Sequence, residues 1–484
     1  MKKSILISLF PQKNTESFCE IPKFKQGKIY VDLPHGYFNS LDELKVYIES
    51  LKDLGVNVIL LLPHFLPSSS PYVVKDYESV TSLFKDWDTF SNFMKFISDL
   101  GMDRMIDIPI NHADKQVLNL SEKFFLEYET GGVEAGTFDV DADDNIIEIK
   151  WGAYILDNSN LDLIDYWIKK VLFPHVSERN VNAVRIDAAW GLDSEGLKKL
   201  VRETKEKYPN TWFLAENLGM NQLIKLARSG IEAGADRFFN NFYWYSGGRS
   251  IPSDIYRFYT KSMGKPTCNI WSSHDVLMPA MKALGTLRGK DFKGKNDKYI
   301  HREIVDKEGT DSLLKLDSDL VDSVLTIMKQ DYLLAALFST DIMFLAGSEK
   351  CLLKRYSVIE STPEDFKLGI ESDVPEFIKR VNKIKFSFEI FNTEGVVIPF
   401  GDWERGKLGV KGYVKQTNEE LLVIMVNNDL LEKNKLTQKL PQKLQKYNEF
   451  YEITFEGIKN CPEIKDIKEV TLEPGDGYII FARK

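Results

Sequence analysis

The chain has 484 residues, so two or three structural units are expected rather than one core. Hydrophobic residues make up 43% of it and charged residues 28%, which is the composition of a soluble globular protein. The formal net charge of −9 argues against nucleic acid or an anionic membrane surface as partner, because both select for a basic face. No apolar run approaches the roughly 20 residues that cross a membrane.

The N-terminus and the cysteines both predict a cytoplasmic protein. The apolar run at residues 5–10 is short, Pro11 ends it and no small-residue cleavage site follows, so it predicts a strand rather than an export signal. Four cysteines, Cys19, Cys268, Cys351 and Cys461, are too scattered for a zinc or redox motif. They are expected to be reduced, unpaired thiols.

From residue 28 onward, short apolar segments alternate with amphipathic ones. Strands are predicted at residues 28–33, 56–63, 104–110, 182–189, 212–216, 236–240, 269–273 and 341–347. Helices are predicted at 40–55, 87–101, 194–208 and 221–230, with Ser40 capping the first and Glu43 completing a capping box. This alternation predicts an α/β fold, and eight repeats predict a (β/α)8 TIM barrel.

Two connections are longer than simple loops. Residues 112–160 form a small excursion after the third strand, with a β-hairpin at 139–155. Its DVDADDN stretch is similar to a calcium loop, but Asp144 stands where an EF-hand needs glycine and Lys150 where it needs glutamate, which favours a plain turn. Residues 275–320 are charged and weakly periodic, which predicts either a mobile loop over the site or a solvated surface.

The helical pattern stops near residue 392, and strand-like runs separated by turn signals follow. These runs predict a C-terminal antiparallel β-sandwich. The predicted organisation is therefore barrel at 1–111, small excursion at 112–160, barrel again at 161–391, and β-sandwich at 392–484.

Polar residues gather at the carboxyl ends of the predicted barrel strands, where the active site of such a barrel lies. They are Asp107, Asn111 and His112 after the third strand, Arg185 and Asp187 on the fourth, Glu216 on the fifth, and His274 and Asp275 on the seventh. One Asp after a strand is often only a helix cap. Charged groups on several strand ends together indicate a catalytic site.

The spacing of these residues predicts a division of labour between two carboxyls. Arg185 and Asp187 are two residues apart, so they share one face of the strand, and the guanidinium is expected to lower the pKa of Asp187. An ionised Asp suits a nucleophile. Glu216 follows the apolar run 212–215, and desolvation there favours the protonated form that a general acid needs. Retaining glycoside hydrolysis uses such a pair, about 5–5.5 Å apart.

Several segments in order resemble the motifs of glycoside hydrolase family 13, the α-amylase family. DIPINH at 107–112 resembles the D-x-V-x-N-H segment, AVRIDAAW at 183–190 resembles G-x-R-x-D, and FLAEN at 213–217 resembles the segment of the acid glutamate. WSSHD at 271–275 resembles the segment that ends in H-D. SPYVVKDY at 70–77 and LDNSNLDLIDYW at 156–167 resemble two further family segments. The resemblance covers residues 28–484.

The resemblance implies a role for each matching residue. Asp187 corresponds to the nucleophile, Glu216 to the acid/base, and Asp275 to the carboxylate that stabilises the transition state. The other matching residues correspond to substrate-binding positions: Arg185, His112, His274, Tyr72 under the sugar ring, and Asp107 at the floor. Trp190 and Gly191 replace the Lys-His pair of calcium-dependent amylases, so only Asn111 points to a metal, and no cofactor is expected to be required.

The resemblance implies a retaining glycosidase or transglycosidase that acts on α-linked glucans or maltooligosaccharides. Aromatic residues at 242–245 are expected either to bind the chain or acceptor, or to pack between the barrel and its helices. Three alternatives are a sugar phosphorylase or phospho-sugar transferase of the family, a catalytically inactive binding protein, and a metal-dependent hydrolase. The three carboxylates argue against the inactive protein, and the six histidines, which form no His-x-His pair, argue against the metal enzyme.

Overall fold

The structure is a computed structural model. It describes residues 27–140, 146–217, 232–240, 265–288, 310–401, 408–436, 446–454, 458–462 and 470–484. The strand predicted at 5–10 and the helix predicted at 221–230 lie outside these residues.

Eight parallel strands close into a barrel, in the order β1-β13-β12-β11-β10-β9-β5-β2. In chain order they are β1 (Ile29–Leu33), β2 (Val58–Leu61), β5 (Asp103–Ile108), β9 (Ala183–Ile186), β10 (Trp212–Ala215), β11 (Arg237–Phe239), β12 (Thr267–Ile270) and β13 (Asp341–Leu345). Each overlaps a predicted segment, which confirms the TIM barrel. β5 begins one residue before its predicted segment, and β12 begins two residues before its own, because Cys268 already pairs with β11 and β13.

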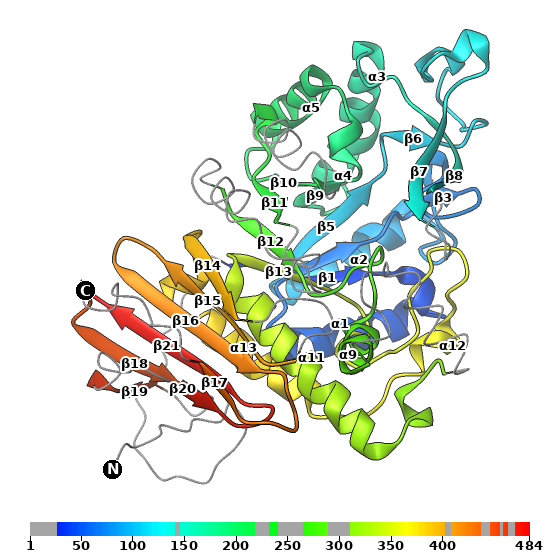
Figure 1. The fold of residues 1–484 in the computed structure, drawn as a ribbon. Coiled ribbons are helices and arrows are strands. Elements are labelled where there is room, and N and C mark those ends of the chain that lie inside the picture. The colour runs from blue at the N-terminus through cyan, green and yellow to red at the C-terminus, as the bar shows by residue number, and fades with distance from the viewer. Residues whose placement is uncertain are drawn as a thin grey trace, which may run out of the picture.

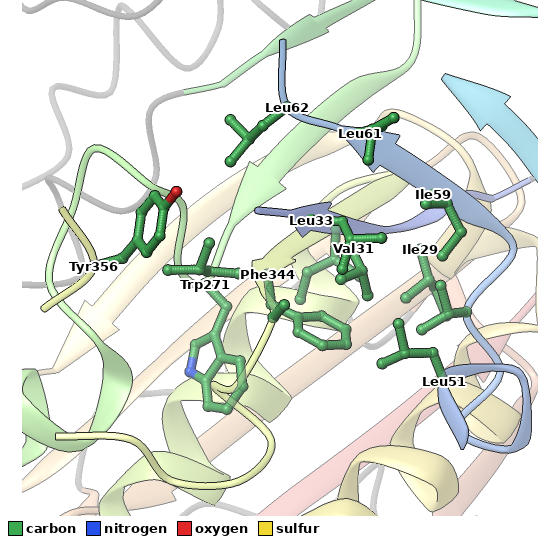
Figure 2. Close-up of a cluster of buried hydrophobic side chains, with 14 of the residues drawn as sticks. Ile29, Val31, Leu33, Leu51, Ile59, Leu61, Leu62, Trp271, Phe344 and Tyr356 are labelled. Atoms are coloured by element: carbon green, nitrogen blue, oxygen red, sulfur yellow. The ribbon is translucent and has the colours of Figure 1, made fainter. Parts of the chain in front are cut away.

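Alternating side chains fill the barrel and cover its outside. An inner cluster contains Tyr30, Val58, Leu60, Met105, Ala183, Leu214, Cys268 and Ile270. The residues between them, such as Ile29, Val31 and Leu33 of β1, point outward to the helices, and Figure 2 shows them beside Ile59, Leu61 and Leu51. Because the side-chain period of a strand is two, the inner set predicts which polar residues face the barrel interior farther along each strand.

Helices surround the barrel (Figure 1). They are α1 (Leu41–Asp53), α2 (Trp87–Asp99), α3 (Leu161–Tyr166), α4 (Phe173–Ser177), α5 (Ser194–Lys207), α9 (Pro279–Leu287), α11 (Ser318–Phe338), α12 (Pro363–Phe366) and α13 (Val374–Lys385), with a π-helical segment, Trp167–Leu172, joining α3 to α4. The Ser40 hydroxyl caps α1 through the Glu43 amide at 3.2 Å, as predicted. The Glu43 carboxylate accepts from the Asn39 amide rather than from Ser40, so the predicted capping box is displaced by one residue.

The long connection predicted at 275–320 is structured where it is described. Residues 279–287 form α9, which buries Pro279, Ala280, Met281, Ala283 and Leu284. The prediction of a loop there was wrong because the charged stretch that follows dominates the average over the whole segment. Residues 289–309 lie outside the described residues.

Two small antiparallel sheets stand at the carboxyl end of the barrel. One pairs β3 (Phe65–Pro67) with β4 (Val74–Val80), and the other has the order β6-β8-β7, formed by β6 (His112–Ala113), β7 (Glu134–Val140) and β8 (Ile146–Ile155). The predicted hairpin is confirmed as β7 and β8, which pair from Val140 and Ile146 outward. In Figure 1 this excursion is the cyan part beside the barrel mouth.

The C-terminal part is antiparallel, as predicted. A six-stranded sheet has the order β14-β15-β16-β21-β18-β19, and a two-stranded sheet pairs β17 with β20. The strands are β14 (Val396–Gly401), β15 (Val410–Gln416), β16 (Glu420–Asn427), β17 (Asn434–Leu436), β18 (Glu449–Ile453), β19 (Ile458–Asn460), β20 (Val470–Leu472) and β21 (Gly477–Arg483). A separate cluster that includes Val414, Val423, Leu472 and Ile480 forms their core.

Helix α11 joins this part to the barrel. The Gln330 amide donates to the carbonyls of Asn427 and Gly475, and the Tyr413 hydroxyl donates to the carbonyl of Leu334. None of the helices in the described residues is long and apolar enough to cross a membrane.

Two fully buried histidines form a pair between β2 and α4. The Nε2 atoms of His64 and His175 are 2.8 Å apart, and Nδ1 of His175 lies 2.6 Å from the carbonyl of Val171. The ring of His175 is neutral when it donates to Val171 and its Nε2 accepts from His64, and the buried Nδ1 of His64 has no hydrogen-bond partner among the described residues, which disfavours a second proton on that ring. Burial accordingly lowers the pKa of His175 to about 3 and that of His64 well below its usual value.

We predict that the His64–His175 pair makes the fold sensitive to acid. The unfolded chain binds protons at these rings below about pH 6.5, whereas the folded chain does not, so the free energy of unfolding falls as the pH falls from about 6.5 toward 3. In wild type, the free energy of unfolding falls between pH 7 and pH 5. Replacing His175 by Phe should make this fall smaller by about 2 kcal/mol, as measured by urea unfolding at the two pH values. Phe90→Leu, which alters packing beside the pair without removing a titrating group, should leave that loss unchanged. An unaltered pH dependence in His175→Phe would contradict the prediction.

Candidate active site

The predicted polar residues lie together at the carboxyl end of the barrel, and the inner positions of the strands place them there. Tyr30, Met105, Ala183 and Leu214 face the interior. Two residues after each of them stand Asp32, Asp107, Arg185 and Glu216, and Asp187 follows Arg185 by two. These side chains therefore converge on the barrel axis from four strands or their ends.

The guanidinium of Arg185 lies at the centre of the site. Arg185 is the register partner of Asp107 across β9 and β5, and its Nη1 forms an ion pair with Asp107 Oδ2. The same nitrogen is 3.1 Å from Asp187 Oδ1, and Nη2 is 3.1 Å from Glu216 Oε2. Only 2% of the Arg185 side chain is exposed. Burial opposes its charge, but the carboxylates of Asp107 and Glu216 raise the pKa of Arg185, which keeps it charged.

The pKa of Asp187 moves opposite to the sequence prediction. Arg185 does favour the ionised form, as expected. Burial and the nearby Glu216 carboxylate outweigh it, however, and raise the pKa of Asp187 well above its usual value. The prediction was wrong because it counted the neighbour in sequence and not the desolvation and the second carboxylate that the fold adds. The environment of Asp187 therefore favours its protonated form.

Glu216 is held by the backbone that follows Asp187. Its Oε2 accepts a 2.6 Å hydrogen bond from the amide of Ala188. Ala188 has φ 44° and ψ 38°, the left-handed region that non-glycine residues rarely adopt. Such strain collects at functional sites, and here it turns one amide toward a carboxylate on the next strand. Sequence reasoning missed this donor because alanine gives no signal of backbone conformation.

A hydrogen-bonded chain connects Arg185 to His274. The Tyr72 hydroxyl donates to Asp107 Oδ2 at 2.8 Å and lies 2.9 Å from His274 Nε2. The two rings are stacked, with centroids 5.1 Å apart and planes 23° apart. Burial raises the pKa of Asp107 to about 6 against the opposing charges of Arg185 and His274. Tyr72 and Asp107 are thus hydrogen-bonded to each other, and their implied places under the sugar ring and at the floor of the site stay predictions.

Two carboxylates hold His274. Asp275 Oδ2 is 3.3 Å from its Nε2, and its Nδ1 is 2.8 Å from Asp32 Oδ2. Burial works against the charge, but Asp275 and Asp32 raise the pKa of His274 to about 10. The Asp275 side chain is half exposed, whereas Asp32 is fully buried. Sequence reasoning missed Asp32, although its signal resembled that of Asp187: a carboxylate at an inner position near the end of an apolar strand.

His112 and Asn111 lie on the excursion side. The His112 ring contacts Trp151 of β8 at a centroid distance of 5.1 Å, and burial lowers the pKa of His112 to about 4. A Cβ on Gly191 would stand 2.9 Å from Asn111 Oδ1, so a larger residue there would displace this amide. Within the described part of the chain, no group of three or more His, Cys, Asp or Glu side chains could hold a metal ion.

Polar atoms without a protein partner gather in this site. Four buried side-chain atoms of the site lack a hydrogen bond among the described residues: Asp32 Oδ1, Asp107 Oδ1, His112 Nδ1 and Arg185 Nε. Buried polar groups are normally satisfied, so orphaned ones at a barrel mouth indicate a polar ligand. The aromatic stretch at 242–245, predicted as a second contact, lies outside the described residues.

No protein-family model and no curated protein matches this sequence. Solved structures do match. A maltogenic α-amylase from Thermotoga neapolitana is 16% identical, with a TM-score of 0.65 over 96% of this chain and 100% of that one. An α-amylase from Geobacillus thermoleovorans, complexed with acarbose, is 14% identical, with a TM-score of 0.65 over 96% and 99%. A trehalose-6-phosphate hydrolase from Bacillus licheniformis is 12% identical, with a TM-score of 0.64 over 96% and 100%.

These matches establish the fold. The chain shares, over nearly its full length, the barrel with an excursion and a C-terminal β-domain found in these α-amylase-type structures. The resemblance that the motifs suggested is confirmed at this level.

We predict that Arg185→Gln destabilises the protein in a pH-dependent way. Removing the guanidinium leaves buried carboxylates unpaired at pH 7, which should lower the free energy of unfolding by about 3–5 kcal/mol. At pH 5 the loss should be smaller, because Asp107 and Asp187 then take up protons in the variant. Urea unfolding at both pH values measures the difference.

Arg104→Gln is the matched control for this experiment. Arg104 is half-buried and donates to the carbonyl of Asn180 and the hydroxyl of Ser98 rather than to a carboxylate. Its loss should be small and equal at both pH values. If Arg185→Gln lost the same free energy at pH 5 as at pH 7, the carboxylates would not be the cause of its destabilisation.

Proposed function

We propose that this protein belongs to glycoside hydrolase family 13 and is a retaining glycosidase or transglycosidase acting on α-linked glucans or maltooligosaccharides. One observation carries the proposal: a single buried guanidinium, that of Arg185, contacts both Asp187 and Glu216 at the mouth of a barrel of the α-amylase type. Two carboxyls on one guanidinium are close together. That favours the retaining arrangement over the wider inverting one.

In the first step, an oxygen of Asp187 attacks the anomeric carbon of the sugar. The bond from that carbon to the glycosidic oxygen breaks, and Glu216 gives its proton to the departing oxygen. A covalent glycosyl-enzyme forms, and Glu216 becomes a carboxylate. This division of roles is the one that the motif resemblance implies for Asp187 and Glu216. It requires Asp187 to be ionised when the sugar is bound, although burial raises the pKa of Asp187 in the structure.

In the second step, Glu216 removes a proton from the incoming hydroxyl, whose oxygen attacks the anomeric carbon and releases Asp187. Water as the acceptor gives hydrolysis, and a sugar hydroxyl gives transfer. The residues around the two carboxyls would bind the sugar. His274 and Asp275 would hold its hydroxyls, and the Tyr72 ring would support it beside Asp107.

The reaction needs no cofactor, because the two carboxyls supply both the nucleophile and the proton. The Geobacillus thermoleovorans α-amylase of the same fold is complexed with acarbose, which supports a glucan-type ligand at this barrel mouth. The buried thiols of Cys268 and Cys351 fit a reducing compartment, and we place the enzyme in the cytoplasm.

We predict that the protein converts maltooligosaccharides and that Asp187→Asn abolishes the conversion. An amide cannot form the glycosyl ester, so the rate should fall by about four orders of magnitude or more, as when other catalytic groups are removed. Products are separated by chain length after incubation with each oligosaccharide. Products longer than the substrate identify a transferase, and only shorter ones identify a hydrolase.

Asp193→Asn is the control for that variant. Asp193 caps α5 through the amides of Glu195 and Gly196, and asparagine caps equally well, so activity should persist. If the wild type leaves all the sugars unchanged, with or without phosphate, the protein is an inactive binding protein. More than a few per cent of activity in Asp187→Asn would remove Asp187 as nucleophile.

We predict that Glu216→Gln separates substrates by their leaving group. A maltooligosaccharide needs a proton on its departing oxygen, whereas α-glucosyl fluoride does not. Loss of the general acid should therefore reduce kcat for formation of the glycosyl-enzyme by about 10²–10⁴-fold on the glucan and far less on the fluoride. Stopped-flow measurement of fluoride release tests this. Equal losses on both substrates would count against Glu216 as the acid.

A further inference from the structure

Asp32 is a buried carboxylate that none of the family motifs includes. It occupies the inner position of β1 two residues after Tyr30, and its side chain is fully buried. Its Oδ2 accepts two hydrogen bonds from one residue, from the backbone amide and from Nδ1 of His274, both at 2.8 Å. Two bonds to the same residue fix both the position of that residue and the rotation of its ring.

The contacts of the ring require a proton on each nitrogen. Nδ1 faces the carboxylate of Asp32, so it donates. Nε2 faces the Tyr72 hydroxyl at 2.9 Å, and that hydroxyl gives its own proton to Asp107. Tyr72 can therefore only accept from His274. A histidine that donates from both nitrogens is an imidazolium.

The charges around this ring come from several elements. The groups that act on it in the described residues are Asp32 on β1, Asp275 after β12, Tyr72 between β3 and β4, Asp107 on β5 and Arg185 on β9. Arg185 disfavours the charged ring, and the carboxylates favour it. Asp275 is half exposed and hence partly screened by solvent, whereas Asp32 is not, so the buried carboxylate is the steadier partner.

We propose that Asp32 is a positioning residue that keeps His274 as an imidazolium and fixes its ring against Tyr72 and Asp275, beside the bound sugar. The inference rests on the proposed function for its catalytic consequence. Asp32 does not touch the reacting atoms. It acts through His274, in the way that a carboxylate behind a histidine sets ring orientation and protonation in other enzymes.

The direct test is the titration of His274 in the full-length protein. Histidines labelled with ¹³C and ¹⁵N are followed by NMR between pH 5 and pH 10, and His274→Gln assigns the signal. In the wild type, both nitrogens of His274 should carry protons at pH 8. In Asp32→Asn the midpoint of the titration should fall by about 1 pH unit or more, because an amide cannot balance the ring charge.

Glu349→Gln is the matched control. Glu349 is also a buried carboxyl, but it accepts from Tyr47 and the amide of Gly347 and does not contact His274. Its titration curve for His274 should match the wild type. If Asp32→Asn leaves the midpoint unchanged, or if wild-type His274 is a neutral ring at pH 8, the proposal is overturned. The second result needs no variant, so the test stands even if Asp32→Asn does not fold.

The catalytic consequence has its own measurement. On maltooligosaccharides, Asp32→Asn should lower kcat/KM by about 10–100-fold, the loss expected for a hydrogen bond to a charged group. In the plot of activity against pH for Asp32→Asn, the alkaline limb should move to lower pH. The reason is that activity declines as the pH rises through the titration midpoint of His274, which the substitution lowers. Asp32→Glu, which keeps the carboxylate, should recover part of both. An unshifted alkaline limb in Asp32→Asn would overturn the link between this pair and the reaction.

The two readouts separate this inference from the proposed function. A shifted titration with no turnover of any glucan by the wild type would leave the Asp32–His274 pair standing and remove the glycosidase. Turnover of a glucan with an unshifted titration of His274 would support the glycosidase and remove the Asp32–His274 proposal.

Discussion

One buried guanidinium determines the arrangement of this site. Arg185 lies inside the barrel, and three carboxylates from three strands or their ends contact it. A charge in such a place is costly unless its partners are close and well oriented. The register of β5 against β9 puts Asp107 directly opposite Arg185, so the partner is fixed by the backbone ladder and not only by the side chain. Of the other two carboxyls, Asp187 contacts the same nitrogen as Asp107, and Glu216 contacts Nη2.

The same parity of the strands explains why so much was predictable from sequence. A charged residue near the carboxyl end of an apolar strand indicates an inner position at the barrel mouth. Asp107, Arg185 and Glu216 all fit this pattern. The eight strands were predicted for the same reason, since each is a short buried run between amphipathic segments. Asp32 fits the same pattern. It was missed because no single-strand pattern shows that β1 and β12, far apart in sequence, bring Asp32 against His274.

The features that could not be predicted from the sequence depend on the three-dimensional surroundings of a residue rather than on its neighbours along the chain. The pKa of Asp187 was expected to fall because Arg185 is two residues away, but burial and Glu216 raise it. Desolvation is a property of the assembled site, and the second carboxylate arrives from another strand. The left-handed backbone at Ala188 is equally invisible, because it is imposed by the turn that follows β9. Helix α9 was not predicted for a different reason: its apolar residues were considered together with the charged stretch that follows it.

The site contains more acidic groups than cations. Around Arg185 and His274 stand five carboxyl groups, Asp32, Asp107, Asp187, Glu216 and Asp275. Asp32 and Asp275 share the imidazolium, which leaves three carboxyls for the one guanidinium. Burial raises the pKa of Asp187 and of Asp107 even beside the guanidinium. One guanidinium therefore does not balance the acid groups that the fold brings together around it, and this excess of acid is unfavourable for stability. In the proposed function, Asp187 and Glu216 of this acid group are the reacting pair, and in the proposed positioning role Asp32 keeps the second cation, His274, in place.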